Sequence, residues 1–160
     1  MTKKYDDFIS FLEKYRDELA FALSNEREKR QALLSSDIER LEAILQVQQA
    51  ETMKLKGFES KRATMQAELG FDDYTAKEIV AAVSDAEAGE RLGLLFSEIV
   101  DLVNDIKQQN KLAIELANTD LKLLDKVFNN IDSNAQNGLY TPDSNMKNPF
   151  SKGSSIKEII

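Results

Sequence analysis

The fold is decided by residues 99–131, which read IVDLVNDIKQQNKLAIELANTDLKLLDKVFNNI. Apolar residues recur there in steps of three and four, the spacing that places side chains on one face of an α-helix. Near Ala117 the pattern carries one extra residue relative to a regular coiled-coil repeat. The positions of this stripe are Ile99, Val103, Ile106, Asn110, Ala113, Ala117, Leu121, Leu124, Phe128 and Ile131. So long a helix with one continuous apolar face predicts an all-α bundle.

Two further long helices are predicted upstream, over residues 2–34 and 38–69. The first has an apolar stripe of Tyr5, Phe8, Leu12, Tyr15, Leu19 and Ala22, widened by Phe11, Phe21 and Leu23. The second has one face of Ile38, Leu41, Leu45, Leu55 and Leu69 and a neighbouring face of Ile44, Val47, Phe58 and Met65. At about 1.5 Å per residue the second helix would reach roughly 50 Å, so it extends past its core. We expect an elongated antiparallel helical bundle, or coiled coil, of three long helices.

The ends of these helices carry capping signals. Gly70 suits the left-handed position that ends a helix. A Ser or Thr followed three residues later by Glu has the spacing of a capping box. The expected boxes pair Ser36 with Glu39, Thr75 with Glu78 and Ser84 with Glu87. The last two boxes predict short helices between the second and third long ones.

The helical pattern ends after Ile131. Both prolines, Pro142 and Pro149, lie beyond it among Ser, Asn and Lys residues. We therefore divide the chain into a helical bundle over residues 1–133 and a flexible C-terminal tail over residues 134–160. Residues 132–143 have a faint likeness to a calcium loop. They lack the Gly at its sixth position and the Glu at its twelfth, so we interpret them as the turn that ends a helix.

The composition excludes most catalytic chemistry. The chain has 160 residues, enough for one domain, and contains no His, Cys or Trp. Disulfides, thiolate nucleophiles, imidazole bases and Cys/His zinc sites are therefore ruled out. Carboxylate pairs such as Asp101 and Asp105 are typical of a solvated helix face rather than acid–base machinery. We expect no enzymatic activity, no metal and no cofactor.

The charge pattern argues against nucleic acids and membranes. The net charge is −7, with −1 over residues 1–70 and −6 over residues 71–160. No basic block is present that would bind a phosphate backbone. No apolar run is long enough to span a bilayer, and the first residues lack the apolar core of a signal peptide. We expect a cytoplasmic protein.

The stripe over residues 99–131 has two interpretations. As core, it would bury Asn110 as an amide that sets register through a hydrogen bond to another helix. As a docking surface, it would offer an apolar face to an amphipathic helix of a partner, with Asn110 as a polar anchor. Helices of unequal length favour the second use at their protruding ends.

The order of these segments resembles the FlgN-type flagellar export chaperones. The features that carry the resemblance are a long helix, a second one after Ser35-Ser36-Asp37, short helices, and a third long helix containing Gln108-Gln109-Asn110. In the tail, Leu139-Tyr140-Thr141-Pro142-Asp143 looks like the family's Leu-Tyr-Gly-x-Asp-Gly stretch. Thr141 and Ser144 stand where that pattern has glycines.

The resemblance implies a cytosolic chaperone of the type III flagellar export apparatus. Such chaperones bind the C-terminal helical segments of hook-associated proteins 1 and 3 and deliver these clients to the cytoplasmic domain of the export gate. Tyr140 is then the residue expected to contact the gate. The residues expected to contact the client are Asn110, Ala113, Ala117, Leu121, Leu124 and Phe128. The alternative is a structural coiled-coil adaptor without export cargo, with the same stripe as a homodimer seam.

Overall fold

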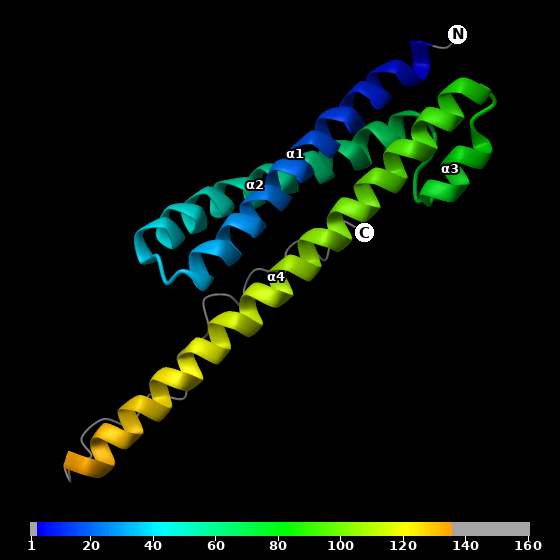
Figure 1. Cartoon of the computed structure of the whole chain (residues 1–160). Coiled ribbons are helices and arrows are strands. Elements are labelled where there is room, and N and C mark those ends of the chain that lie inside the picture. The colour runs from blue at the N-terminus through cyan, green and yellow to red at the C-terminus, as the bar shows by residue number, and fades with distance from the viewer. Residues whose placement is uncertain (1–2, 136–160) are drawn as a thin grey trace.

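The structure is a computed structural model that describes residues 3–135, except for the side chains of Phe128 and of residues 131–135. It contains the helices α1 (Lys3–Leu34), α2 (Ile38–Glu68), α3 (Ala76–Ala82) and α4 (Ala86–Ala135). No strand occurs in the described part of the chain. The predicted all-α fold and elongated bundle are confirmed (Figure 1).

Helix α1 is the centre of the bundle because it packs against both α2 and α4. The α1–α2 pair is an antiparallel hairpin, as Gln48 contacts Glu26 while Glu59 contacts Tyr15. Helix α4 runs parallel to α1, since Arg91 pairs with Glu13 and Lys29 with Asn110 further along. The direction follows from the connection: α2 returns the chain to the start of α1, where Phe71 stacks on Tyr5, and α4 begins at that same end after the short α3.

The main core lies between α1, the second half of α2, α3 and the first half of α4. The stripe predicted for α1 is confirmed, with Phe8, Leu12, Tyr15 and Leu19 at 1% exposure or less. Leu92, Leu95, Val103 and Ile106 of α4 are buried to the same extent. Tyr15 stacks on Phe58 of α2 with ring centroids 5.5 Å apart. Phe21, expected to widen the α1 stripe, is instead exposed.

The stripe predicted for α2 is only partly buried. Ile44 and Leu55 are buried, whereas Ile38 is 69% exposed and Val47 is exposed. Because α2 packs mainly against a single helix, α1, it can bury only a narrow strip of its surface. The expectation of two apolar faces on α2 was therefore wrong for its first half.

At two of the predicted helix starts, the capping residue is the one that follows the predicted serine. Asp37, not Ser36, caps α2 and accepts a hydrogen bond from the backbone N–H of Arg40. Ser36 cannot do so because it adopts a left-handed conformation in the turn, with φ of 53°. Asp85 replaces Ser84 in the same way at the start of α4. In both cases a carboxylate, the stronger acceptor, takes the cap.

The remaining signals are confirmed with one correction. Thr75 and Glu78 form the predicted capping box of α3, and Gly70 has φ of 83° after the end of α2. The separate short helix expected from residue 84 does not exist, because α4 is continuous from Ala86 to Ala135. Most of the predicted tail, including Tyr140, lies outside the described residues. No helix within residues 3–135 combines the length and apolar character needed to cross a membrane.

Candidate functional site

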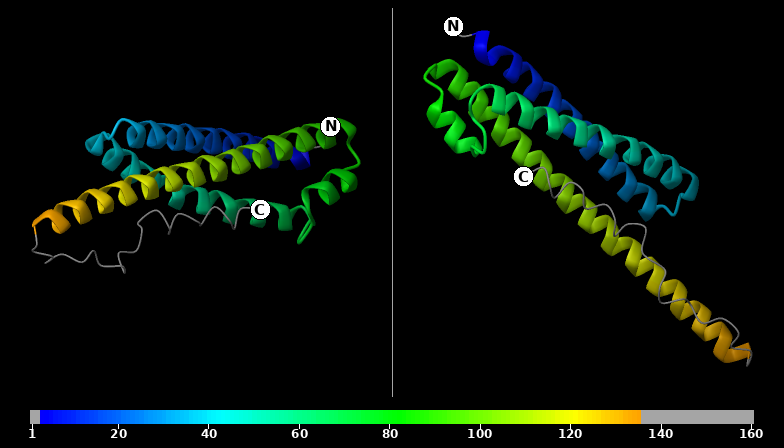
Figure 2. Two further views of the ribbon diagram at one scale, coloured as in Figure 1. Left: turned by 60° about the horizontal axis from the view of Figure 1, so that its bottom comes forward. Right: turned by 180° about the vertical axis from the view of Figure 1, so that it is seen from behind.

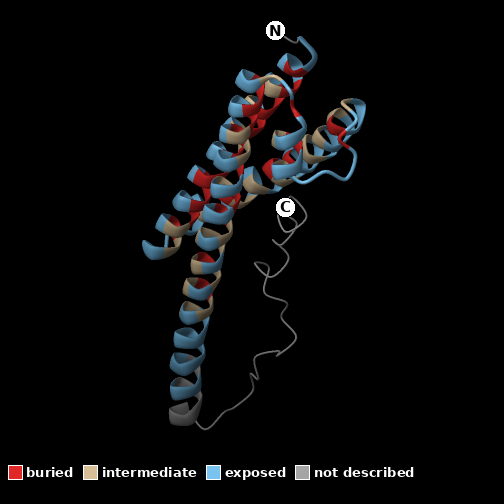
Figure 3. Ribbon diagram, turned by 90° about the vertical axis from the view of Figure 1, so that its right-hand side faces the viewer, coloured by how far each residue is buried: buried red, intermediate tan, exposed pale blue. Residues whose placement is uncertain are grey.

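Helix α4 extends beyond the other helices. Figures 1 and 2 show it continuing past the turn between α1 and α2, beyond the other helices that the structure describes. We call residues 118–135 the overhang; they are about 27 Å long at 1.5 Å per residue. Leu121, Leu123, Leu124 and Val127 lie on it, and each is at least 50% exposed. In Figure 3 the exposed surface runs along this end of α4, while buried residues gather toward the other end of the molecule.

The overhang continues the face of α4 that packs against α1. Ile106, Ala113 and Ala117 are buried on that face. Leu124 follows Ala117 by seven residues, which on a straight α-helix rotates a position by only about 20°. Leu121 follows Ala117 by four residues and is displaced by about 40°. A helix placed in line with α1, beyond its end, would therefore meet the same apolar stripe.

The six residues expected to contact the client lie in different environments. Ala113 and Ala117 are buried, and Asn110 is half-buried. Leu121 and Leu124 are exposed, and the side chain of Phe128 lies outside the described ones. Leu123 and Val127 were missed as exposed apolar residues because they fall beside the three-four stripe. Each of them directly precedes a residue of the stripe, Leu124 or Phe128, and this pairing in the sequence indicates an apolar surface wider than the stripe.

A buried polar network connects the three long helices just before the overhang begins. The Nζ atom of Lys29 lies 2.9 Å from Oε2 of Glu26 and donates a hydrogen bond of 3.1 Å to Oδ1 of Asn110. Nε2 of Gln48 donates a hydrogen bond of 3.0 Å to Oε1 of Glu26. Lys29 is only 3% exposed. The cross-helix hydrogen bond considered for Asn110 is therefore present, with Lys29 as its donor.

The neighbouring part of the α1–α2 interface is polar and incompletely paired. Nδ2 of Asn25 and Oε1 of Glu51 are buried and have no hydrogen-bond partner. Burial, together with a hydrogen bond to Glu18 and the charge of Glu18, raises the pKa of Glu51 to about 7. Lys54, whose Nζ lies 3.0 Å from Oε2 of Glu18, opposes this shift. Burial and the neighbouring carboxyl of Glu18 thus favour the neutral form of Glu51.

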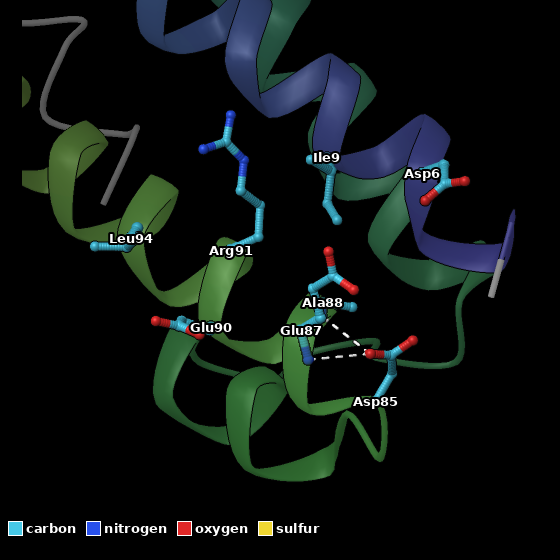
Figure 4. Close-up of a pocket in the computed structure, with 8 residues that line it drawn as sticks. All are labelled: Asp6, Ile9, Asp85, Glu87, Ala88, Glu90, Arg91 and Leu94. Atoms are coloured by element: carbon cyan, nitrogen blue, oxygen red, sulfur yellow. Dashed lines mark hydrogen bonds between the residues drawn. The ribbon is translucent and has the colours of Figure 1, made fainter. Parts of the chain in front are cut away.

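Two clefts lie at the opposite end of the molecule. One, of about 330 Å³, separates the start of α1 from the start of α4 (Figure 4). Two of its charged side chains have structural roles: Asp85 accepts from the backbone N–H groups of Glu87 and Ala88, and Arg91 pairs with Glu13. The other, of about 490 Å³, lies between α2, α3 and α4 and is lined by Tyr15, Phe96 and Val100 among others.

Polar side chains in both clefts are engaged in contacts within the protein. The hydroxyl group of Tyr15 in the larger cleft donates to Glu59, and burial is the main cause that raises its pKa. Within residues 3–135 no group of three or more acidic side chains is placed to hold a metal ion. The exposed apolar surface of α4, which no other helix of residues 3–135 covers, is therefore the feature that best indicates binding.

The comparison with protein families decides the assignment. The family described as FlgN protein matches residues 1–148, which is nearly the whole chain. The chain belongs to the FlgN family. No curated protein and no solved structure matches it. Members of the FlgN family are flagellar export chaperones that bind hook-associated proteins, and this is a chaperone family rather than an enzyme family.

Proposed function

We propose that this FlgN chaperone binds the C-terminal helical segments of hook-associated proteins 1 and 3 in the cytoplasm and delivers them to the export gate. The observation that supports it is the overhang: Leu121, Leu123, Leu124 and Val127 form an exposed apolar surface on a helix whose first half is buried in the core. An amphipathic helix packs on such a surface by burying apolar residues at i, i+3 and i+4. Covering it needs no catalysis and no cofactor.

The test is a titration with peptides of the client C-termini, comparing wild type with Leu124→Ala. Leu124 is 52% exposed, so its truncation should leave the unfolding midpoint unchanged. Removal of a central anchor should weaken peptide binding by about tenfold or more. Leu94→Ala is the matched control, because Leu94 is 55% exposed on the same helix at its other end. An equal loss for both variants, or none for Leu124→Ala, would refute the assignment of the surface.

Delivery to the gate is proposed to depend on Tyr140, which lies outside the described residues. An aromatic ring beside Pro142 can anchor a linear motif through ring burial and one hydroxyl hydrogen bond. Tyr140→Ala should leave folding and client binding intact and weaken docking to the gate domain by about 2 kcal/mol or more. The assay titrates the gate domain with wild type and variant, each preloaded with client. Equal affinities would contradict the proposal, and loss of client binding would move Tyr140 into the client site.

The coiled-coil adaptor is the competing function, and it would use the same surface differently. A homodimer formed through Leu121 and Leu124 would appear in sedimentation as self-association that Leu124→Ala abolishes. Absence of peptide binding together with such a dimer would favour the adaptor.

A further inference from the structure

The α1–α2 hairpin has a tip that is separated from the main core. We define the hairpin tip as residues 25–51, the end of α1, the turn and the start of α2. The main hydrophobic cluster ends at Leu23 on α1 and Ile106 on α4. Beyond it, the buried apolar residues of the tip and of the α4 segment beside it are Ala32, Ile44, Ala113 and Ala117, which are not part of that cluster. Ile44 is the one large side chain among these four, and Leu33, Leu41 and Leu45 of the tip are only half-buried, so the tip is packed less tightly than the main core.

A layer of buried and half-buried polar side chains lies between the main core and this small contact. Its members are Asn25, Glu26, Lys29, Gln48, Glu51 and Asn110. Asn25 keeps a buried Nδ2 atom without a partner, which costs free energy as long as the tip is closed. Leu34 and Ile38, which flank the turn, are exposed, and so is Val47 on α2. The tip therefore has the features of a segment that opens locally at low cost.

The α4 surface beside the tip is the start of the overhang face. Asn110 is bonded to Lys29 of the tip, and Ala113 and Ala117 are buried on the face that packs against α1. Leu121 and Leu124 continue that face without interruption, as their spacing from Ala117 shows. If α1 moved away, the exposed stripe would lengthen from Leu121–Leu124 to Asn110–Leu124. That is about four turns of helix instead of one.

We propose that the hairpin tip opens away from α4 as a unit and that the client helix takes its place on residues 110–124. This inference rests on the proposed client function and names how the site is regulated. The closed tip shields half of the client surface when no client is bound. The client replaces an alanine-lined, partly unpaired contact with its own apolar side chains. The apparent affinity is then the intrinsic affinity reduced by the fraction of molecules whose tip is open.

The first measurement needs no client. Hydrogen exchange of the full chain should show backbone amides of residues 25–34 and 38–51 exchanging together, at least tenfold faster than those of residues 8–19 and 92–106. Uniform exchange across the two groups would show that the tip opens only with the whole bundle, and would overturn the proposal.

The second measurement uses two variants that act in opposite directions. Ala32→Gly removes a buried methyl group and loosens the helix, so tip exchange should rise twofold to fivefold, about the effect of Gly in a helix interior. Asn25→Leu has the same branching as Asn and removes the unpartnered Nδ2, so tip exchange should slow by about tenfold. Ala20→Gly is the matched control, because Ala20 is exposed on α1 outside the tip.

Client binding should follow exchange in each variant. With a C-terminal peptide of hook-associated protein 1, Ala32→Gly should bind twofold to fivefold more tightly and Asn25→Leu more weakly, while Ala20→Gly should match wild type. A purely structural tip predicts no gain of affinity from a destabilising change. Unchanged affinity in Ala32→Gly, despite faster exchange, would refute the proposal while leaving the client function in place. Absence of peptide binding by wild type would refute the client function, and the exchange data would still decide whether the tip opens.

Discussion

The stability of this protein should depend on pH through Glu51. Its pKa is raised to about 7 in the folded chain, against 4.5 for an ordinary glutamate, because the carboxyl is buried beside Glu18. The folded state thus holds the proton more tightly than the unfolded state. The resulting stabilisation is complete below pH 4.5 and is lost as the pH rises through about 7. At pH 8 the buried carboxyl of Glu51 is charged, and its desolvation is no longer avoided by a bound proton.

The substitution that tests this is Glu51→Gln. The amide of Gln can donate a hydrogen bond at every pH, whereas the carboxyl of Glu51 can donate one only when it is protonated. The full pKa shift of Glu51 corresponds to about 3 kcal/mol in the free energy of unfolding. Lys54 is 57% exposed, so solvent reaches this site and should screen the effect to about 1–2 kcal/mol. We therefore expect the variant to be more stable than wild type by about 1–2 kcal/mol near pH 8 and equal to it near pH 4.

Urea unfolding followed by circular dichroism at these two pH values measures the difference. Glu42→Gln is the control, because Glu42 is exposed on the same helix and should change stability equally at both. A Glu51→Gln variant with the same stability difference at both pH values would show that Glu51 titrates normally. The reasoning about the carboxyl pair would then be wrong.

Two further predictions concern particular residues. Gly57→Ala should stabilise the protein by about 0.5–1 kcal/mol, because a Cβ there meets nothing within 4 Å. Gly70→Ala should destabilise it by about 1 kcal/mol or more, because Gly70 has a φ of 83°. A thermal unfolding experiment in which Gly70→Ala is the more stable variant would contradict the assigned end of α2. Lys29→Met should cost about 3–5 kcal/mol because Glu26 stays buried without its cation, and adding Glu26→Gln should restore most of that loss in urea unfolding.

Much of the fold could be read from local patterns. The steps of three and four predicted the stripes of α1 and α4 and the helical class, because a helix brings such positions to one face whatever surrounds it. The caps at Thr75 and Gly70 were predicted for the same reason: their hydrogen bonds and dihedral angles involve neighbouring residues only. Asp37 and Asp85 show the limit of this approach, since Ser36 and Ser84 had equally good spacing.

The candidate site could be predicted only in part. The stripe over residues 99–131 identified one apolar face but not how far α1 would cover it. Ala117 and Leu121 belong to the same pattern, yet one is 5% exposed and the other 50%. Their difference in exposure depends on which residues of α4 lie beside the end of α1. The packing of the two helices sets this position, and α1 ends some eighty residues earlier in the chain.

The sequence by itself determined the helices, the face of each that is apolar and, through the missing His and Cys, the absence of imidazole and thiolate chemistry. These follow from covalent identity and from periods of a few residues. Only the tertiary structure decided that α4 runs parallel to α1, that Lys29 is the partner of Asn110, and that the stripe divides into a covered half and an exposed half. These depend on how helices of unequal length are stacked, because burial is a property of neighbours that periodicity within one helix does not specify.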